Sequence, residues 1–467
     1  MMVVLGLSVS PALPLDWQAT YSASTSVSGT SNANLAPDGQ EEAAVTSRLT
    51  ISSMARATGR RLRFATDSSL SFVRRTDRDS PTIDQSLNAI SSIELLTNRI
   101  FVDANLTSTR ELVSPTTAVT GGDAATDDRG RVSITSLSVS PYWQQRYGHW
   151  AQSLVRYRHT EVIAGSQAND SRDDAVNFQL VGGQKLTPWR PALTADWSNK
   201  DERASGGRVA ADVLQYSIGF GNQFALSRLY SVNAVVGYQK VDATTDRRNL
   251  SGFVWSVGAI GRPGPRTSFD VSVGQRYGEL AVNGTARYAI TDRLTLRLQA
   301  RQNYGTGAQR LVADASLVTV NPTTGELETP AGVPVGFGDT GVDGALSIDQ
   351  MFLASLVGVY GRNRVTLTGS VEQRQFDVGT ETIGLTRGVV TRTLGPRTSA
   401  SVSGFYRTDD SILGVVTQTI SGRLDLSYRI GERATVFGGY SYTQRLSDVA
   451  TGGYSEHVGT IGGRVTF

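Results

Sequence analysis

Cysteine is absent from this chain of 467 residues. Its absence excludes disulfide bridges, thiolate metal sites and cysteine nucleophiles. Histidine is scarce as well, because the chain holds only three, His149, His159 and His457. Lysine is also rare, since all but three of the 45 basic residues are arginine. Side chains that often serve metal binding or nucleophilic catalysis are therefore few.

Long apolar runs are missing too. The longest, Met351 to Tyr360, is interrupted by Ser355 and Gly358, and it falls short of the roughly 20 residues that a membrane-spanning helix requires. No segment keeps a helical apolar period, whereas 49 glycines and abundant serine, threonine and valine favour strands and tight turns. A mean hydropathy of −0.19 would suit a soluble protein. The placement of the apolar residues, rather than their number, therefore decides the fold class.

The C-terminal segment alternates strictly between two kinds of residue. Ile461, Val465 and Phe467 share one face with two glycines, and polar side chains such as Arg464 occupy the other. This alternation is typical of a strand with one face in lipid and the other in water. The terminal aromatic and its apolar partners resemble the signal that the barrel assembly machinery recognises. We therefore predict a membrane-assembly signal at Ile461, Val465 and Phe467.

The same alternation recurs along nearly the whole chain and predicts about 22 strands of about 10 to 18 residues each. The connections between them are of two alternating kinds. One kind is short and often carries arginine, at 58–60, 96–99, 145–148, 187–190, 227–228, 262–266, 291–293, 361–364, 394–397 and 431–433. The other is usually longer and polar, at 29–40, 76–82, 114–130, 165–172, 199–207, 243–249, 306–341, 377–381, 408–414 and 447–453. Between Ser268 and Ile290 the outer connection at 276–280 is itself tight, so one hairpin could be gained or lost there.

These patterns predict an all-β chain, a transmembrane antiparallel β-barrel of the outer membrane of a Gram-negative bacterium, with short periplasmic turns and longer external loops. An even strand number places both termini in the periplasm. Residues 16–467 are predicted to form this single barrel. Residues 1–15 are interpreted as the remnant of a signal peptide, because the small residues Ser10 and Ala12 follow an apolar stretch. An ordinary apolar first strand is the alternative.

Barrels of about 22 strands normally hold a plug in the lumen. Only residues 1–15 precede the first predicted strand, so we expect no N-terminal plug domain. The one internal candidate for an occluder is the loop 306–341, which has no periodicity of its own. Long connections of this kind are usually functional or disordered. Residues 306–341 are therefore either a loop folded over the pore or a flexible external loop.

The alternation also predicts which side chains point into the barrel. In the segment 291–303 the leucines face lipid, which turns the arginines between them inward. The predicted lumen-lining residues are Arg287, Arg293, Arg297, Arg301, Arg364, Glu372, Arg407, Arg423, Asp425, Arg429 and Arg464. One interpretation is a guanidinium-lined lumen that attracts anionic groups. The other is a set of arginine–carboxylate ladders that stiffen the wall.

Catalytic and metal-binding patterns are weak. Ser455 and His457 share one face of a predicted strand while Glu456 points to the other, so these three cannot form a relay. Acidic loop clusters could offer oxygen ligands to Ca²⁺, but they lack the glycine and spacing of a calcium loop; they are Asp123, Asp127 and Asp128, and Asp170, Asp173 and Asp174. We predict no enzymatic activity, no cofactor, no metal site and no nucleic-acid partner.

Three segments carry a resemblance to a known family. They are Ser31 to Glu42, with the string Asn-Leu-Ala-Pro-Asp-Gly-Gln-Glu-Glu; Ile93 to Ala104, followed by Val113-Ser-Pro115; and Ser138 to Trp143. Together they resemble the PEP-CTERM system-associated outer-membrane β-barrel family, whose members are encoded with exosortase and exopolysaccharide gene clusters. The resemblance covers roughly the first 160 residues, and the family offers no catalytic residues to carry over.

The resemblance implies a role in exporting or anchoring an exopolysaccharide. We therefore expect a conduit of a polysaccharide secretion system. Its expected partners are outer-membrane lipid, the barrel assembly machinery, exopolysaccharide and periplasmic export components. Two alternatives remain open at the level of sequence. One is a general or solute-specific diffusion porin, and the other is a structural barrel that scaffolds surface assembly without conducting.

Overall fold

The computed structural model describes residues 15–112, 131–165, 169–203, 210–310, 319–320, 327–328, 345–449 and 452–467. In these ranges no helix is long and apolar enough to cross a membrane. The elements are β1 (Asp16–Thr30), β2 (Ala44–Thr58), β3 (Leu62–Arg75), β4 (Thr82–Leu96), β5 (Ile100–Leu112), β6 (Arg131–Tyr147), β7 (Ala151–Ala164), β8 (Asp170–Gly182), the 3₁₀ turn η1 (Gln184–Leu186), β9 (Trp189–Arg203), β10 (Val213–Ala225), β11 (Tyr230–Ala243), β12 (Gly252–Gly264), β13 (Thr267–Arg276), β14 (Glu279–Thr291), β15 (Leu294–Gly305), β16 (Thr319–Val320), β17 (Leu327–Glu328), β18 (Ser347–Tyr360), β19 (Asn363–Gln375), β20 (Thr380–Thr393), β21 (Thr398–Asp410), β22 (Val416–Ile430), β23 (Ala434–Ser447) and β24 (Tyr454–Thr466).

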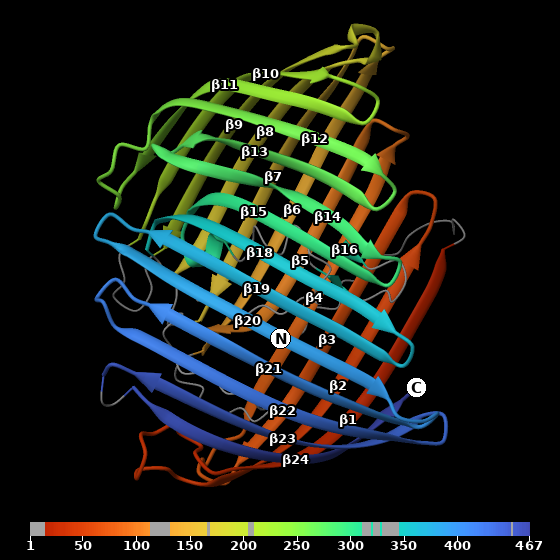
Figure 1. Ribbon diagram of the computed structural model, residues 1–467, viewed down its shortest axis with the longest axis vertical. Coiled ribbons are helices and arrows are strands. Elements are labelled where there is room, and N and C mark those ends of the chain that lie inside the picture. The colour runs from red at the N-terminus through yellow and green to blue at the C-terminus, as the bar shows by residue number, and fades with distance from the viewer. Residues whose placement is uncertain are drawn as a thin grey trace.

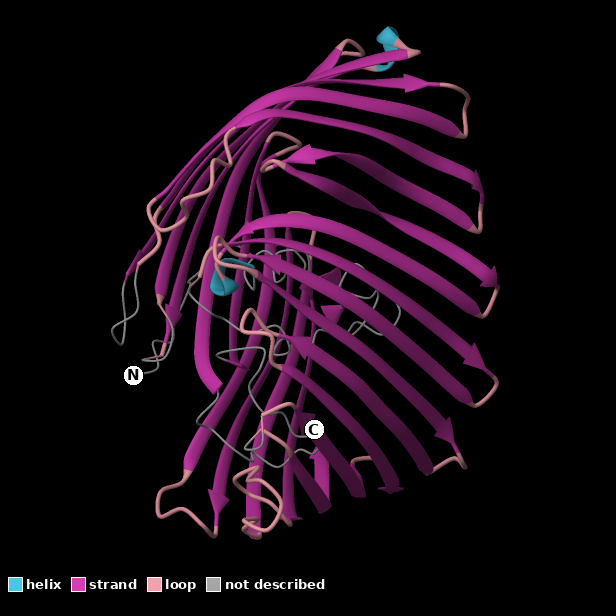
Figure 2. Ribbon diagram, turned by 60° about the vertical axis from the view of Figure 1, so that its left-hand side comes forward, coloured by secondary structure: helices cyan, strands magenta, loops and turns pink. Residues whose placement is uncertain are grey.

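One sheet of 22 antiparallel strands closes on itself to form the barrel (Figures 1 and 2). Each strand pairs with its successor in the chain, and β15 pairs with β18. Closure comes from β1 and β24, which pair from Ser22–Thr466 to Thr30–Val458. At the seam the Phe467 backbone N–H donates to the Tyr21 carbonyl at 2.8 Å. The predicted strand number and the all-β, closed antiparallel barrel are therefore confirmed.

The two faces of each strand differ as the alternation predicts. On β22 the inner residues Thr417, Thr419 and Ser421 are buried, while the outer Leu424 is 46% exposed. On β24 the outward-facing Ile461 is 70% exposed. Large apolar side chains left on the outside of a closed antiparallel sheet are stable only against lipid. The barrel is therefore of the outer-membrane type, with its apolar outer surface in the bilayer.

The two ends of the barrel have different connections. At one end, which we call the turn end, the connections are short hairpins such as 361–362 and 431–433. Gly361 and Gly431 adopt φ angles of +58° and +67° there, a backbone conformation that other residues adopt at a steric cost. At the other end, the loop end, most connections are longer. Short turns face the periplasm in outer-membrane barrels and longer loops face the outside.

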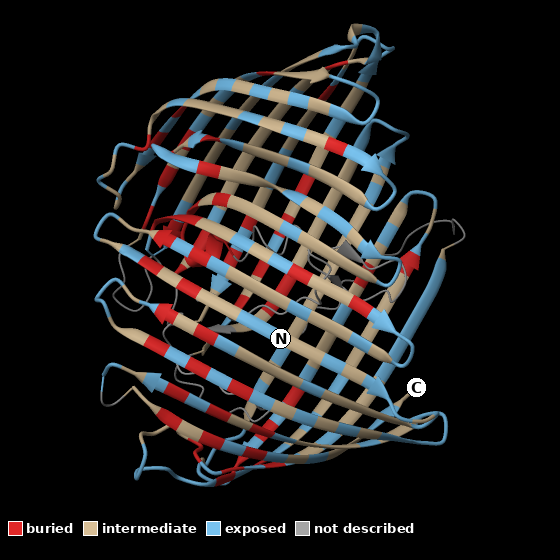
Figure 3. Ribbon diagram, viewed as in Figure 1, coloured by how far each residue is buried: buried red, intermediate tan, exposed pale blue. Residues whose placement is uncertain are grey.

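Buried residues gather at the loop end, where Figure 3 shows red along the ends of many strands. The hydrophobic core cluster also lies there, and its members are Ala211, Val213, Val241, Leu250, Tyr277, Tyr304, Leu346 and Ile348. Most of the turn end is coloured as intermediate or exposed in the same view. A barrel with an open lumen has no continuous core, so its apolar packing is confined to places where the chain folds over the mouth.

The tight connection predicted at 276–280 is a two-residue turn, Tyr277-Gly278, between β13 and β14, and both strands belong to the barrel. The connection predicted at 306–341 extends from 306 to 346. It contains a helical turn at 307–310 and the short β16–β17 pair, so it has some regular structure of its own. Apart from β16 and β17, residues 311–344 lie outside the described residues, as do residues 1–14 and the predicted loop 114–130. The described residues include no plug domain in the lumen.

Candidate functional site

On part of the inner face of the barrel, along β20 to β24, β1 to β3 and β6 to β7, hydroxyl side chains bond to one another across neighbouring strands. The oxygen–oxygen distances in these pairs run from 2.7 to 3.3 Å; the pairs are Ser28–Thr460, Thr50–Ser71, Ser138–Thr160, Thr391–Ser401, Ser399–Ser427 and Ser421–Thr443. A hydroxyl both donates and accepts, so each pair keeps lone pairs free for a passing solute. The surface can therefore make many weak hydrogen bonds without a single strong one.

Charges near the loop end form ladders within the wall. Arg374 on β19 is fully buried, and its guanidinium lies 2.6 Å from Glu372 and 3.5 Å from Glu381 of β20. On β21, Arg407 donates to Asp409 at 2.9 Å. A spacing of two residues puts the arginine and the acid on the same face of one strand. Buried charges are tolerated when they are paired in this way, so these arginines support the wall.

The predicted lumen residues occupy several kinds of position. Arg407 and Arg423 are in ion pairs, the latter with Asp425 at 2.8 Å. Arg287 and Arg297 lie opposite each other on β14 and β15, and Arg301 contacts the Met351 sulfur at 3.3 Å. Glu372 is buried in the ladder with Arg374. Arg364 and Arg429 are exposed near the turn end. Arg464 and Asp425 line a hollow of about 450 Å³. Arg293 precedes β15 and lies in the turn.

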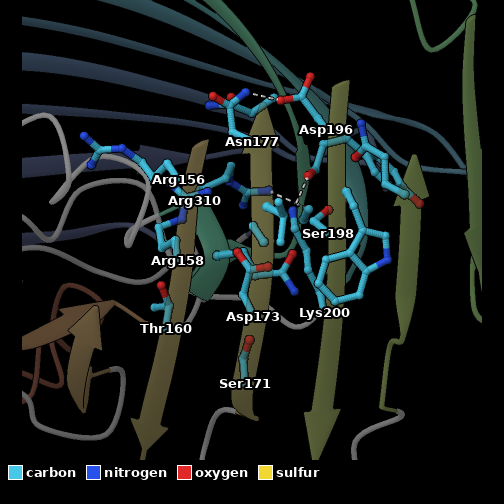
Figure 4. Close-up of a pocket in the computed structure, with 18 of the residues that line it drawn as sticks. Arg156, Arg158, Thr160, Ser171, Asp173, Asn177, Asp196, Ser198, Lys200 and Arg310 are labelled. Carbon is cyan, nitrogen blue, oxygen red and sulfur yellow. Dashed lines mark hydrogen bonds between the residues drawn. The ribbon is translucent and has the colours of Figure 1, made fainter. Parts of the chain in front are cut away.

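A cavity of about 500 Å³ lies inside the barrel at the loop end (Figure 4). One wall consists of β7, β8 and β9, and the opposite side is formed by the tip of the β13–β14 hairpin, the end of β15 and the helical turn that follows it. Its charged lining residues are Arg156, Arg158, Lys200, Arg276 and Arg310, with Asp173 and Asp196 as the only acids. The lining is therefore strongly basic.

The cavity cations are held differently from those of the ladders. Arg156 donates to Asp103 at 2.9 Å and its guanidinium stacks 4.1 Å from the centre of the Tyr142 ring. Lys200 donates to the backbone carbonyl of Tyr304 at 3.2 Å. Within the described chain the Arg158 guanidinium has no hydrogen bond or ion pair, and Arg158 is exposed to the lumen. The cavity thus presents cationic donors that acids do not fully neutralise.

The cavity exists because the mouth of the barrel bends inward. Tyr277 and Gly278 adopt φ angles of +56° and +80°, the geometry of a tight type I′ hairpin turn. A positive φ is unfavourable for a bulky side chain. Two contacts hold Tyr277 in this conformation, because its hydroxyl accepts a hydrogen bond from Gln215 at 3.2 Å and its ring centre lies 5.4 Å from that of Tyr304. As a result only 5% of Tyr277 is exposed.

The loop 244–251 closes over the same region, and we call its contacts the mouth latch. Asp246 accepts from Arg248 at 2.6 Å and from the Tyr304 hydroxyl at 3.1 Å. Arg248 also donates to the Gln375 carbonyl at 3.0 Å. Burial opposes ionisation of Asp246, but hydrogen bonds from Arg248 outweigh it and hold the pKa of that carboxyl below its ordinary value. The latch joins β11 and β12 to β15 and β19 across the short β13–β14 hairpin.

The segment that carries the family resemblance has a structural role in this barrel. Asn32, which is fully buried, donates to the carbonyls of Ala36 and Ser455 at 2.8 and 3.0 Å and accepts from the Ala36 N–H at 2.8 Å. Arg75 of β3 donates to the Ala33 carbonyl at 3.0 Å. The first loop is therefore tied to both β24 and β3, over the strand pair that closes the barrel.

Among the described residues, the histidines and the acidic cluster Asp170, Asp173 and Asp174 are not gathered into a metal site. His457 is exposed and bonds to the Tyr440 hydroxyl at 2.7 Å, whereas Glu456 faces inward and accepts from Thr30. His159 bonds to Asp174 at 2.7 Å on the outer surface. Among the described residues no group of three His, Asp or Glu could hold a metal ion. The cluster Asp123, Asp127 and Asp128 lies outside these residues.

The cationic lining of the cavity was missed at the sequence level. The signal for Arg156 and Arg158 is present, because a spacing of two puts both on one face, and the outward Tyr157 between them identifies that face as the inner one. Lys200 alternates in the same way with Trp197 and Asn199. What the sequence does not contain is the proximity of β7–β9 to the end of β15, six strands further along the sheet.

Comparisons with known proteins place the fold. No protein-family model and no curated protein matches the chain. Among solved structures, the ferric-catecholate import receptor Fiu from E. coli K12 aligns at a TM-score of 0.50 and 9% identity, over 96% of this chain and 82% of that one. BauA, the ferric preacinetobactin receptor from Acinetobacter baumannii, aligns at 0.49 and 9%, over 96% and 80%.

At 9% identity the likeness to Fiu concerns the fold alone, a wide outer-membrane barrel. The strand number, the closed sheet and the apolar outer surface locate this chain in the outer membrane of a Gram-negative bacterium. Nothing in the comparisons bears on the PEP-CTERM-associated family, and membership of it stays a prediction.

Proposed function

We propose that this barrel is the outer-membrane conduit for an exopolysaccharide. The observation that carries the proposal is the inner surface of paired hydroxyls, which is continuous over several strands of the wall. A hydrated polymer that must move needs many weak polar contacts and no deep binding site along most of its path. Each displaced water is replaced by a hydrogen bond of similar strength, so the polymer meets little resistance.

The ion ladders support the same interpretation. Because Arg374, Arg407 and Arg423 are paired with acids on their own strands, the wall at these three positions offers no isolated strong charge to which an acidic polymer would adhere. Ten exposed arginines in or next to the short connections form what we call the turn-end collar; they are Arg60, Arg61, Arg99, Arg228, Arg262, Arg266, Arg293, Arg362, Arg397 and Arg433. A basic rim attracts anionic polymers and acidic partner proteins. A periplasmic export component with an acidic surface would be a partner of this kind.

The test is a clean deletion of the gene. We expect less extracellular polysaccharide, with the polymer or its intermediates retained in the cell, and unchanged uptake of small sugars and antibiotics. Expression of the wild-type chain from a plasmid should restore export. Normal surface polysaccharide together with slower permeation of small solutes would contradict the proposal and favour a diffusion porin, the alternative that a wide barrel without a described plug also permits.

A further inference from the structure

We propose that the cavity at the loop end is a binding site for carboxylate-bearing sugar units, so that the exported polymer is acidic. That the bound sugar belongs to a polymer rests on the proposed function, whereas the site itself is inferred from the cavity alone. Its volume of about 500 Å³ lies within the about 300–1,000 Å³ usual for small-molecule sites and accommodates a short stretch of polysaccharide.

The charge of the cavity favours an anion. Five basic side chains and two acidic ones line it, so the lining carries an excess of three positive charges. Arg156 and Arg158 project from β7 and Lys200 from β9, with Arg310 among them in Figure 4. A planar guanidinium matches a carboxylate with two parallel hydrogen bonds. Because Arg158 makes no hydrogen bond or ion pair within the described chain, its guanidinium can offer two donors to a carboxylate without first breaking a contact.

The uncharged lining favours a sugar over a simple anion. Parts of the Tyr277 and Tyr304 rings line one side of the cavity and give a sugar ring an apolar surface to pack on. Amide groups from Asn177, Gln215 and Asn303 line the same space and can both donate to and accept from sugar hydroxyls. Asp173 and Asp196 add acceptors for hydroxyl donors, which a site for a polyphosphate would not place beside the cations.

Tyr277 adds an independent observation. It holds a positive φ of +56°, its side chain is 5% exposed, and it lines the cavity. Strained backbone conformations persist where the surroundings fix them, and they cluster at ligand sites. In this position Tyr277 lies beside Arg276, whose guanidinium is 4.8 Å from the centre of the Tyr277 ring. The hairpin tip thus presents an aromatic ring and a cation together to the cavity.

The experiment measures binding of defined oligosaccharides to the purified full chain in detergent, by calorimetry and by the fluorescence of tryptophan. The probes are oligogalacturonate, the neutral oligogalactoside of equal length, free galacturonate and inorganic phosphate. We expect oligogalacturonate to bind at least about tenfold more tightly than the neutral oligomer, since a charge-assisted hydrogen bond contributes on the order of a factor of ten in affinity. The preference should weaken with salt.

Matched variants separate the site from general charge. Lys200→Gln and Arg158→Gln should each weaken oligogalacturonate binding by about tenfold and leave neutral binding unchanged. Lys240→Gln and Arg172→Gln remove the same charges from neighbouring strands on the outer surface, where both side chains are 57% exposed, and should have no effect. Equal losses in the two sets would overturn the inference. Heat-modifiable migration on a gel verifies that each variant is folded.

The wild-type chain decides the question even where a variant does not fold. Equal affinity for the charged and neutral oligomers would overturn the carboxylate assignment, and so would competition by phosphate at the same concentration as galacturonate. Free galacturonate binding as tightly as the oligomer would assign the cavity to a small carboxylate solute instead of a polymer. Normal surface polysaccharide in the deletion strain would contradict the proposed conduit function. A measured preference for oligogalacturonate over the neutral oligomer would still support the carboxylate site.

Discussion

The loop end and the turn end of the barrel contain the same residue types in different environments. At the loop end Arg374 and Arg407 are buried in ion pairs within the wall. At the turn end Arg364 and Arg429 lie on the same inner face and are exposed to water. On β19 the two situations are met within one strand, because Arg364 and Arg374 point to the same side, ten positions apart.

The difference shows that the role of an arginine in this lumen is set by what covers it. Where the chain folds over the mouth, the local dielectric falls and a charge must be paired. Where the lumen is open, the same guanidinium is solvated and acts only through a screened field. Of the two sequence-based interpretations, stiffening ladders describe the loop end, whereas solvated cations describe the turn end.

The largest effect should come from breaking a ladder. Arg374→Met leaves Glu372 and Glu381 buried without their shared cation, and we expect it to lower the free energy of unfolding by about 3–5 kcal/mol. Urea unfolding in lipid vesicles measures this. Arg364→Met on the same face of the same strand is the control, with an expected change within about 0.5 kcal/mol. Similar losses in both variants would contradict the distinction between the two ends.

A charge on the outer surface should cost somewhat less. Leu424 faces lipid near the middle of β22, so Leu424→Arg should destabilise the barrel by about 2–4 kcal/mol. Thr366→Arg, on the inner face of β19, should cost much less because the lumen is aqueous. The same unfolding measurement applies. A smaller cost at Leu424 than at Thr366 would mean that the faces have been assigned the wrong way round.

The mouth latch should give a smaller, local effect. Tyr304→Phe removes the hydrogen bond to Asp246 and should weaken the latch by about 1 kcal/mol. Hydrogen exchange of residues 244–251 should quicken, while exchange in β1 and β2 stays as it is. Tyr216→Phe, on the outer surface, is the control. If exchange quickened equally across the barrel, the latch would not be a separate unit.

The latch should also respond to acid. Because the pKa of Asp246 is lowered in the folded chain, its contribution is fully present above the ordinary aspartate range near pH 4 and is lost as pH falls below that range. Single-channel recordings from about pH 6 down to about pH 3 should show more frequent fluctuations at the acid end. Asp246→Asn should remove this dependence. An unchanged acid response in that variant would assign it to other carboxylates.

The smallest effect is expected at the turn end. Arg364→Gln should slightly reduce the preference of the pore for anions at low salt, measured as a reversal potential in planar bilayers. At about 1 M salt, where charges are screened within about 3 Å, wild type and variant should coincide. A difference that persists at high salt would show that Arg364 binds ions directly.

Much of the fold could be predicted from the sequence because a strand's period of two is a local property. Leu424 and Ile461 face lipid because of their positions relative to their own neighbours, and the short turns are identified by residues such as Gly361 and Gly431. The pairing of β1 with β24 also follows, since an even number of strands must close to leave no edge in the membrane. These features need no knowledge of distant contacts.

The cavity and the ladders could not be predicted in the same way. Arg158, Arg297 and Arg374 have the same alternating neighbours, yet one is exposed to the lumen, one lies opposite Arg287 and one is fully buried. The environments of these three arginines depend on which strands approach each other across the lumen and on the inward bend of the mouth at Tyr277. Sequence by itself thus determined the strands, their faces and their closure. Only the tertiary structure decided which inward cations can bind a ligand, because burial and distance across a wide barrel are not local properties of the chain.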